Sequence, residues 1–169
     1  AALLFKEAMH IGDGLQLNIH KRIPVAAGLG GGSADAAAVL EGLDRMYQTG
    51  ISLQNMINLG VRLGADVPFC IMKGTALAEG IGEVLTPVKQ MPDCYILLIK
   101  PNLIVSTKHV YQSLRLEHDT PHPDIDRMLH AINSHSLADM AACMGNVLES
   151  VTVRDHPVIQ EIKDKLILS

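Results

Sequence analysis

The feature that most limits what this chain can fold into is a run of glycines between two apolar segments. Four of the five positions 28–32 are glycine, Leu29 is the exception, and Ser33 follows. Without Cβ atoms, several main-chain N–H groups can turn toward one point, and the start of a following helix adds a positive field. We therefore expect an anion site, and a triphosphate suits it best because its oxygens can accept from consecutive amides.

The flanking segments predict the order strand, glycine loop, helix. Leu15, Leu17 and Ile19 alternate with polar residues, which is the two-residue period of a strand with one buried face. Small and apolar residues at helical spacing predict a helix over residues 34–46. A flexible linker is the alternative interpretation of the glycines, but a linker would be flanked by polar spacers rather than by apolar segments.

The rest of the sequence predicts an α+β fold in two parts. In the first part a helix is expected over residues 53–63, and short apolar stretches at 69–72, 75–78 and 94–99 predict antiparallel strands. After Pro101 the pattern becomes helical. The helices expected there cover residues 106–114, 123–133, 137–149 and 156–168. We place a domain boundary near residue 101, which divides the chain into 1–100 and 101–169.

Composition excludes several classes of protein. Hydrophobic residues make up 48% of the sequence and charged residues 19%, so the chain can bury enough apolar surface to fold. A net charge of -4 gives no electrostatic reason to bind nucleic acid. No apolar run reaches the roughly 18–20 residues that cross a bilayer, and the first residues lack the charged region of a signal peptide. We expect neither a nucleic-acid nor a membrane partner.

Cysteine and histidine spacing gives no sign of a disulfide or a metal site. The cysteines, Cys70, Cys94 and Cys143, are far apart, form no C-x-x-C pair and lie among apolar residues, which favours reduced core thiols in a cytoplasmic protein. His118 and His122 have the spacing of one helical turn. Prolines at positions 121 and 123 make a continuous helix there improbable, so we reject zinc binding on one helix face.

Asp66 is the candidate proton acceptor. It is a lone carboxylate in the segment Gly64-Ala65-Asp66-Val67-Pro68, where a charge among small and apolar residues is costly unless it has a role. Transfer of a phosphoryl group to an alcohol needs a group that can accept the hydroxyl proton. Asp66 could equally be a helix N-cap, because Pro68 suits the start of a helix. The residues alone leave both interpretations open.

The glycine loop resembles one particular phosphate motif. A Walker loop is excluded because no lysine follows the glycines, and Ser33 breaks the G-x-G-x-x-G dinucleotide pattern. The segment Pro24-x-x-x-Gly28-Leu29-Gly30-Gly31-Gly32-Ser33 instead resembles the P-x-x-x-G-L-G-S/G-S motif of the GHMP kinases. The resemblance implies that Gly28, Leu29, Gly30, Gly31 and Gly32 wrap the phosphates of ATP. It also implies that Ser33 contacts phosphate or Mg²⁺.

Further residues are nominated by the same resemblance. The segment G-A-D-V-P-F is similar to the loop that holds the family's catalytic aspartate, which would be Asp66 here. The H-K-R-I-P run places Lys21 near the adenine, although a solvated lysine at a strand end is the alternative. Thr107 and Tyr111 match residues that hold a cytidine, and a core position is the alternative for Tyr111. Residues 74–87 match a family hairpin to which we assign no chemistry.

The resemblance also implies an activity. The triple glycine is typical of the GHMP kinases that act on a cytidine diphosphate-linked methylerythritol, a small-molecule substrate. These enzymes transfer the γ-phosphoryl group of Mg-ATP to its 2-hydroxyl in non-mevalonate isoprenoid synthesis. Other GHMP kinases, which act on homoserine, mevalonate or galactose, remain alternatives, as does a nucleotide-binding module without catalysis. The implied fold is part of an N-terminal α/β GHMP domain followed by part of a C-terminal α+β domain.

The sequence also predicts that both ends of the family's full-length enzyme are missing. The family pairs its aspartate with a lysine in a K-I-N-L type segment, and it ends with a glycine-rich S-G-S-G-P type segment. Neither segment is found here, and the sequence does not begin with methionine. We therefore expect a fragment, which need not be active by itself.

Overall fold

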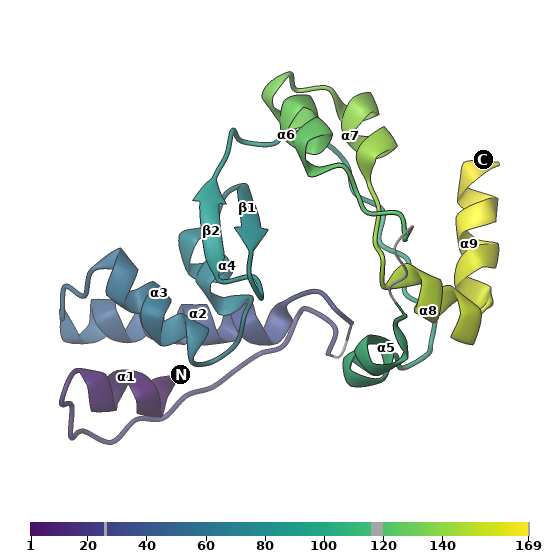
Figure 1. Ribbon diagram of the computed structural model, residues 1–169. Helices are drawn as coiled ribbons and strands as arrows, with labels where there is room; N and C mark the ends of the chain where they lie inside the picture. The colour runs from purple at the N-terminus through teal and green to yellow at the C-terminus, as the bar shows by residue number, and fades with distance from the viewer. Residues whose placement is uncertain (26, 116–119, 169) are drawn as a thin grey trace. The chain divides into compact units, whose positions relative to one another are not determined.

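A computed structural model describes residues 1–25, 27–115 and 120–168, and it is mixed α+β as predicted (Figure 1). His118, one member of the rejected histidine pair, lies outside the described residues. The chain divides into two compact units, Ala1–Gln90 and Met91–Ser169, and each is described by itself. The predicted assignment of two domains that meet near residue 101 stays a prediction.

The first unit is a small helical cluster with a hairpin. Its elements are α1 (Ala2–Ala8), α2 (Gly31–Tyr47), α3 (Leu53–Val61), α4 (Val67–Met72), β1 (Ala76–Glu79) and β2 (Val84–Pro87). Helix α4 packs against both α2 and α3, and α1 packs along α2 (Figure 1). The core is aliphatic except for one ring, and its buried residues are Phe5, Ala37, Leu40, Leu43, Met56, Leu59, Val67 and Ile71.

A glycine allows the close approach of α3 and α4. A Cβ atom at Gly60 would lie 2.9 Å from Cδ1 of Ile71 and 3.1 Å from Cγ1 of Val67. Both distances are shorter than ordinary van der Waals contact, so a larger residue would force the side chains of Ile71 and Val67, or the helices themselves, to shift. Because α4 also packs against α2, this contact helps to fix the segment that begins with Asp66 relative to the glycine loop.

The strand predicted over residues 69–72 is wrong, because these residues belong to α4. A four-residue apolar run suits a buried strand and a buried helix equally well, so periodicity could not separate the two. Pro68 lies in the first turn of α4, where its fixed φ and missing N–H are compatible with a helix. Val67 and Ile71, four residues apart, are both buried against α2 and α3.

The predicted hairpin over residues 74–87 is present. Strands β1 and β2 pair antiparallel, with Ala76 opposite Pro87 and Glu79 opposite Val84. The connecting turn has two glycines at positive φ, +70° at Gly80 and +113° at Gly82, which L-residues rarely adopt.

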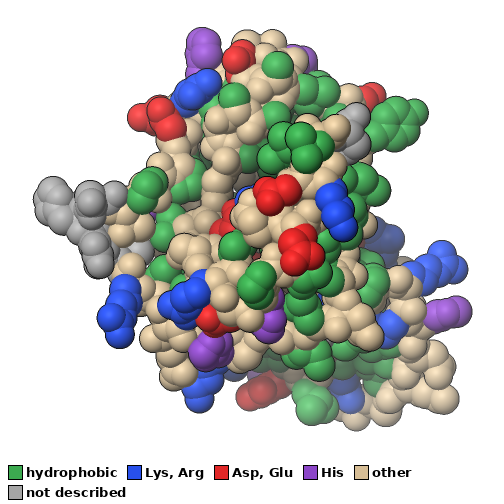
Figure 2. Space-filling model, turned by 90° about the vertical axis from the view of Figure 1, so that its right-hand side faces the viewer, with side chains coloured by type: hydrophobic (Ala, Val, Ile, Leu, Met, Phe, Trp, Pro, Cys, Tyr) green, Lys and Arg blue, Asp and Glu red, His purple; other side chains and the backbone are tan. Residues whose placement is uncertain are grey.

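Two other segments predicted as strands are not strands among the described residues. Residues 15–19 and 94–99 belong to no ladder, and apolar side chains in both are exposed, as 48% for Leu17 and 73% for Leu97 show. Alternating residue types would give a strand one apolar and one polar face. A strand forms only where a neighbouring segment supplies the partners for its backbone hydrogen bonds. Figure 2 shows hydrophobic side chains at the surface among charged ones.

The second unit consists of short helices. They are α5 (Thr107–Ser113), α6 (Ile125–Asn133), α7 (Leu137–Cys143), α8 (Glu149–Asp155) and α9 (Val158–Ile167). Helices α5, α6 and α7 begin at capping residues, Ser106, Asp124 and Ser136, whose side chains each accept from the N–H three residues later. No helix in the described part of the chain is long and apolar enough to span a bilayer.

The single helix predicted over residues 137–149 ends early, at Cys143, and α8 begins only at Glu149. The chain between them passes close to Pro123, since a Cβ atom at Gly145 would lie 3.2 Å from Cγ of that proline. Glycine is also a poor helix former, which favours a break at this point.

Candidate functional site

The glycine loop leads directly into the N-terminus of α2. Helix α2 begins at Gly31 rather than at residue 34, and Gly30 is its N-cap with φ +64°. Gly28 also has positive φ, +69°. These left-handed conformations are costly for residues with a Cβ atom. The backbone of the loop therefore requires glycine at positions 28 and 30.

The start of α2 presents main-chain donors to a pocket. The N–H of Ala34 donates to the carbonyl of Gly30 at 2.9 Å, whereas the N–H groups of Gly31, Gly32 and Ser33 lie ahead of the first intrahelical bond. A pocket of about 390 Å³ opens at this point, within the roughly 300–1,000 Å³ of small-ligand sites. It is lined by Lys21, Pro24, Val25, Ala27, Gly28, Leu29, Gly30, Gly31, Gly32 and Ser33.

Lys21 is the charged side chain of this pocket and lies beside the first residue of α2. Its contact with the adenine stays a prediction. A Cβ atom at Gly31 would be 3.6 Å from Nζ of Lys21 and 3.0 Å from Cγ2 of Ile23. Gly31 therefore lets the segment before the loop cross closely over the helix start. The ammonium of Lys21 forms an ion pair with the carboxylate of Asp35, one turn further into α2. No sequence pattern predicted this ion pair.

Asp66 is in the same unit as the glycine loop but does not line the 390 Å³ pocket. It occupies the N-cap position of α4, yet its side chain makes no capping hydrogen bond, and it is exposed. The capping interpretation thus lacks its hydrogen bond in this structure. Burial, with a smaller contribution from the negative charge of Asp66, raises the pKa of the nearby Cys70 thiol. The role of Asp66 as proton acceptor stays a prediction.

Thr107 and Tyr111 lie on α5 in the second unit. They are four residues apart, so their side chains share one face of the helix. Tyr111 is 63% exposed, which rules out the alternative of a core aromatic. An exposed ring can stack on a base, but the cytidine contact of both residues stays a prediction.

Comparison with known proteins identifies the family. Residues 1–74 match the GHMP kinases N terminal domain. A protein of Lachnoclostridium phytofermentans named 4-diphosphocytidyl-2-C-methyl-D-erythritol kinase is 54% identical over 167 residues, which cover 99% of this chain and 57% of the relative. The chain belongs to the GHMP kinases.

Another relative and a solved structure support the same family. The protein of the same name from Geobacillus thermodenitrificans is 46% identical over 166 residues, 98% of this chain and 57% of the relative. A solved structure of 4-(cytidine 5'-diphospho)-2C-methyl-D-erythritol kinase superposes with a TM-score of 0.77 at 33% identity, and the match covers 99% of this chain and 59% of that one. The predicted GHMP kinase fold is confirmed, and the chain spans a little over half the length of these relatives.

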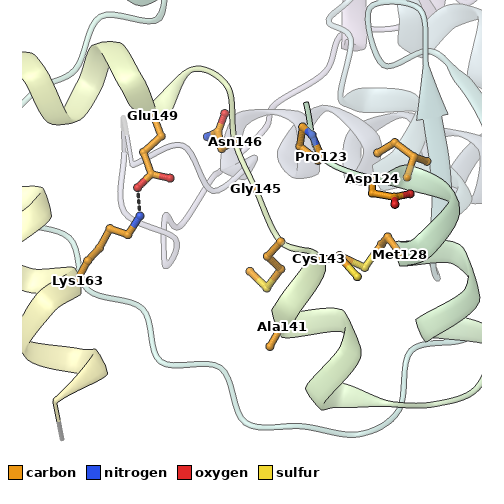
Figure 3. Close-up of a pocket in the computed structure, with 11 residues that line it drawn as sticks. Pro123, Asp124, Met128, Ala141, Cys143, Gly145, Asn146, Glu149 and Lys163 are labelled. Atoms are coloured by element: carbon orange, nitrogen blue, oxygen red, sulfur yellow. Dashed lines mark hydrogen bonds and ion pairs between the residues drawn. The ribbon is translucent and has the colours of Figure 1, made fainter. Parts of the chain in front are cut away.

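A larger pocket of about 610 Å³ lies among α6, α7, α8 and α9 of the GHMP kinase chain (Figure 3). Its polar side chains are already engaged. The Asp124 carboxylate accepts from the N–H of Arg127 at 2.9 Å, and the Asn146 side chain accepts from the N–H of Leu148 at 3.0 Å. The Lys163 ammonium and the Glu149 carboxylate form an ion pair. We assign no ligand to this pocket.

A charged contact that sequence reasoning missed joins α5 to α8 in the same unit. Nε2 of His109 lies 3.0 Å from Oδ2 of Asp155, and Nε of Arg154 donates to Oδ1 of Asp155 at 2.8 Å. These hydrogen bonds, that of Arg154 first, lower the pKa of the Asp155 carboxyl. The contact holds the helix that carries Thr107 and Tyr111. His109 and Asp155 are 46 residues apart in the sequence, so no local sequence pattern could have predicted their contact.

Proposed function

We infer that this GHMP kinase chain is part of an enzyme that uses ATP to phosphorylate the 2-hydroxyl of 4-diphosphocytidyl-2-C-methyl-D-erythritol. The names of its relatives support the substrate. The reaction would belong to non-mevalonate isoprenoid synthesis in the cytoplasm, with a small-molecule substrate and neither a nucleic-acid nor a membrane partner.

The observation that carries this proposal is the glycine pocket at the start of α2. Helix-start N–H groups, the positive end of a helix of 17 residues and the ammonium of Lys21 meet at one place. A polyphosphate is the ligand that such an arrangement favours. The pocket is lined by main chain and small residues, which lets a ligand approach the amides closely.

Mg²⁺ fits this site as a companion of the phosphates. The residues that the structure describes form no group of three or more His, Cys, Asp or Glu that could hold a metal ion. Mg²⁺ commonly keeps several waters and binds through one or two protein ligands together with substrate phosphates. The hydroxyl of Ser33, which lines the pocket, is the protein ligand that we propose.

Asp66, Thr107 and Tyr111 complete the proposal. Asp66 would accept the proton of the 2-hydroxyl as it attacks the γ-phosphorus, since its exposed carboxylate has no capping bond that would compete for it. Thr107 and Tyr111 would bind the cytidine from α5, within the part of the chain that we assign to substrate binding, 101–169. The part that we assign to ATP binding is 1–100.

The test compares ATP binding and turnover in the complete protein, before and after the change Asp66→Asn. This change keeps the shape of the side chain and removes its charge. It should lower kcat by about 10²–10⁴, the usual contribution of a general base, with little effect on ATP affinity measured by calorimetry or on the melting temperature.

Other outcomes separate the alternatives. A melting temperature that falls while turnover stays near normal would contradict catalysis by Asp66. ATP binding without phosphoryl transfer to any acceptor would indicate a nucleotide-binding module. Faster turnover with homoserine, mevalonate or galactose than with the cytidine diphosphate-linked alcohol would assign a different GHMP kinase activity.

A further inference from the structure

We propose that Asp35 is a positioning residue that holds the ammonium of Lys21 against the first turn of α2, at the glycine pocket. The proposal deepens the nucleotide-binding function proposed above and rests on it for its biological meaning. Asp35 does not line the pocket, whereas Lys21 does. Asp35 would therefore act on a bound phosphate through Lys21 and not by direct contact.

The position of the Lys21 ammonium beside the N-terminus of α2 favours a negatively charged partner. Nζ of Lys21 would lie 3.6 Å from a Cβ atom at Gly31, the first residue of α2, where the helix carries its partial positive charge. An ammonium beside that end of a helix is repelled by it. The carboxylate of Asp35 forms an ion pair with this ammonium and offsets the repulsion while no phosphate is bound.

The ion pair between Lys21 and Asp35 also reduces the repulsion between the Asp35 carboxylate and an anion that binds in the pocket. An unpaired carboxylate on the second turn of α2 would oppose a polyphosphate at the helix start. In the ion pair its charge is balanced by Lys21. The two side chains are only about one third exposed, 34% for Lys21 and 36% for Asp35, so solvent screens the pair only in part.

The chain offers a matched control. Lys73 forms an ion pair with Glu41 at 2.8 Å in the same unit, and neither residue lines the glycine pocket. Lys73 is 64% exposed, so its amine is also accessible to a reagent. The changes Asp35→Asn and Glu41→Gln therefore each remove the carboxylate that pairs with one lysine, and Glu41→Gln also removes a contact of 3.8 Å between Glu41 and Arg45.

The experiment measures the rate of amine labelling at each lysine by peptide mass spectrometry. We expect Asp35→Asn to speed the labelling of Lys21 several-fold and to leave Lys73 unchanged, and Glu41→Gln to do the reverse. Asp35→Glu, which keeps the charge, should restore part of the protection. Equal Lys21 labelling in the unmodified chain and in Asp35→Asn would overturn the proposal. Circular dichroism on each variant checks that the helices remain.

A double-mutant cycle with ATP connects the pair to binding. Asp35→Asn should weaken ATP binding by about threefold to tenfold while Lys21 is present. In a Lys21→Met background it should not weaken binding, because the carboxylate of Asp35 is then unpaired and only opposes the phosphates. Tighter ATP binding after Asp35→Asn in both backgrounds would overturn the proposal, since Asp35 would then only repel the anion. No ATP binding by the complete protein would overturn the nucleotide function, while the labelling rates would still decide the role of Asp35.

Discussion

The thiol of Cys70 reports on the charge of Asp66. Burial raises the pKa of Cys70 most, and the negative charge of Asp66 raises it further, so thiolate is scarce near neutral pH. Asp66→Asn removes the second cause. We therefore expect the pKa of Cys70 to fall and its alkylation by iodoacetamide at mildly alkaline pH to become faster. The measurement is the alkylation rate at each cysteine by mass spectrometry.

Cys94 supplies the internal control for this prediction. Cys94 is exposed, so the prediction of a core thiol is wrong for this residue. It also belongs to the other unit, so its alkylation rate should not respond to the change at residue 66. An unchanged rate at Cys70 would show that the carboxylate of Asp66 does not influence the thiol. Because the experiment needs neither substrate nor turnover, it examines the surroundings of Asp66 separately from the proposed catalytic role.

At the scale of elements, Gly60 decides how closely α3 and α4 approach. Gly60→Ala would bring a Cβ atom within 2.9 Å of Ile71 and 3.1 Å of Val67. Overpacking of this kind costs about 1–3 kcal/mol, and the better helix propensity of alanine offsets about 1 kcal/mol of it. We expect a net loss of about 1 kcal/mol in the free energy of unfolding, measured by urea titration.

Gly42 on α2 is the matched control for the helix propensity. A Cβ atom there would meet no atom within 4 Å, so Gly42→Ala should stabilise the chain by about 0.5–1 kcal/mol. The two Gly→Ala variants should therefore differ by about 2 kcal/mol. Equal stabilities would mean that Ile71 and Val67 give way freely and that Gly60 is not required for the packing of α4.

On the scale of the whole molecule, the apolar segment 94–99, which the sequence predicts as a strand, is exposed. Tyr95 is fully exposed and Leu97 is 73% exposed. An extended apolar segment with unpaired backbone groups tends to pair with other chains. We predict that the chain self-associates at micromolar concentration, and that Leu97→Lys raises the monomer fraction by at least about twofold in light scattering after size exclusion.

A single exposed leucine elsewhere serves as the control. Leu3 on α1 is 83% exposed, but its backbone is engaged in a helix. Leu3→Lys should leave the monomer fraction unchanged, because isolated apolar side chains at a surface contribute little to association. A similar gain from both variants would mean that added charge, not the extended segment, controls solubility.

The sequence by itself determined the features that rest on local backbone requirements. The glycines at 28 and 30 have the positive φ that only glycine adopts easily, and a helix follows them as its small residues predict. The hairpin over 74–87 followed from its turn glycines and alternating residues. The family motifs could also be recognised in the sequence, because each motif consists of residues close together in the chain. Ser33 and Asp66 were nominated from these motifs.

Only the tertiary structure decided the features that depend on partners distant in the sequence. Residues 69–72 are helical because α4 packs against both α2 and α3, and residues 15–19 are not a strand because no described segment pairs with them. Lys21 meets Asp35 across the glycine loop, and His109 meets Asp155 from another helix. Periodicity describes which side of an element is apolar. It cannot say which segment will supply the facing surface, the hydrogen bonds or the opposite charge, because chain folding brings these together.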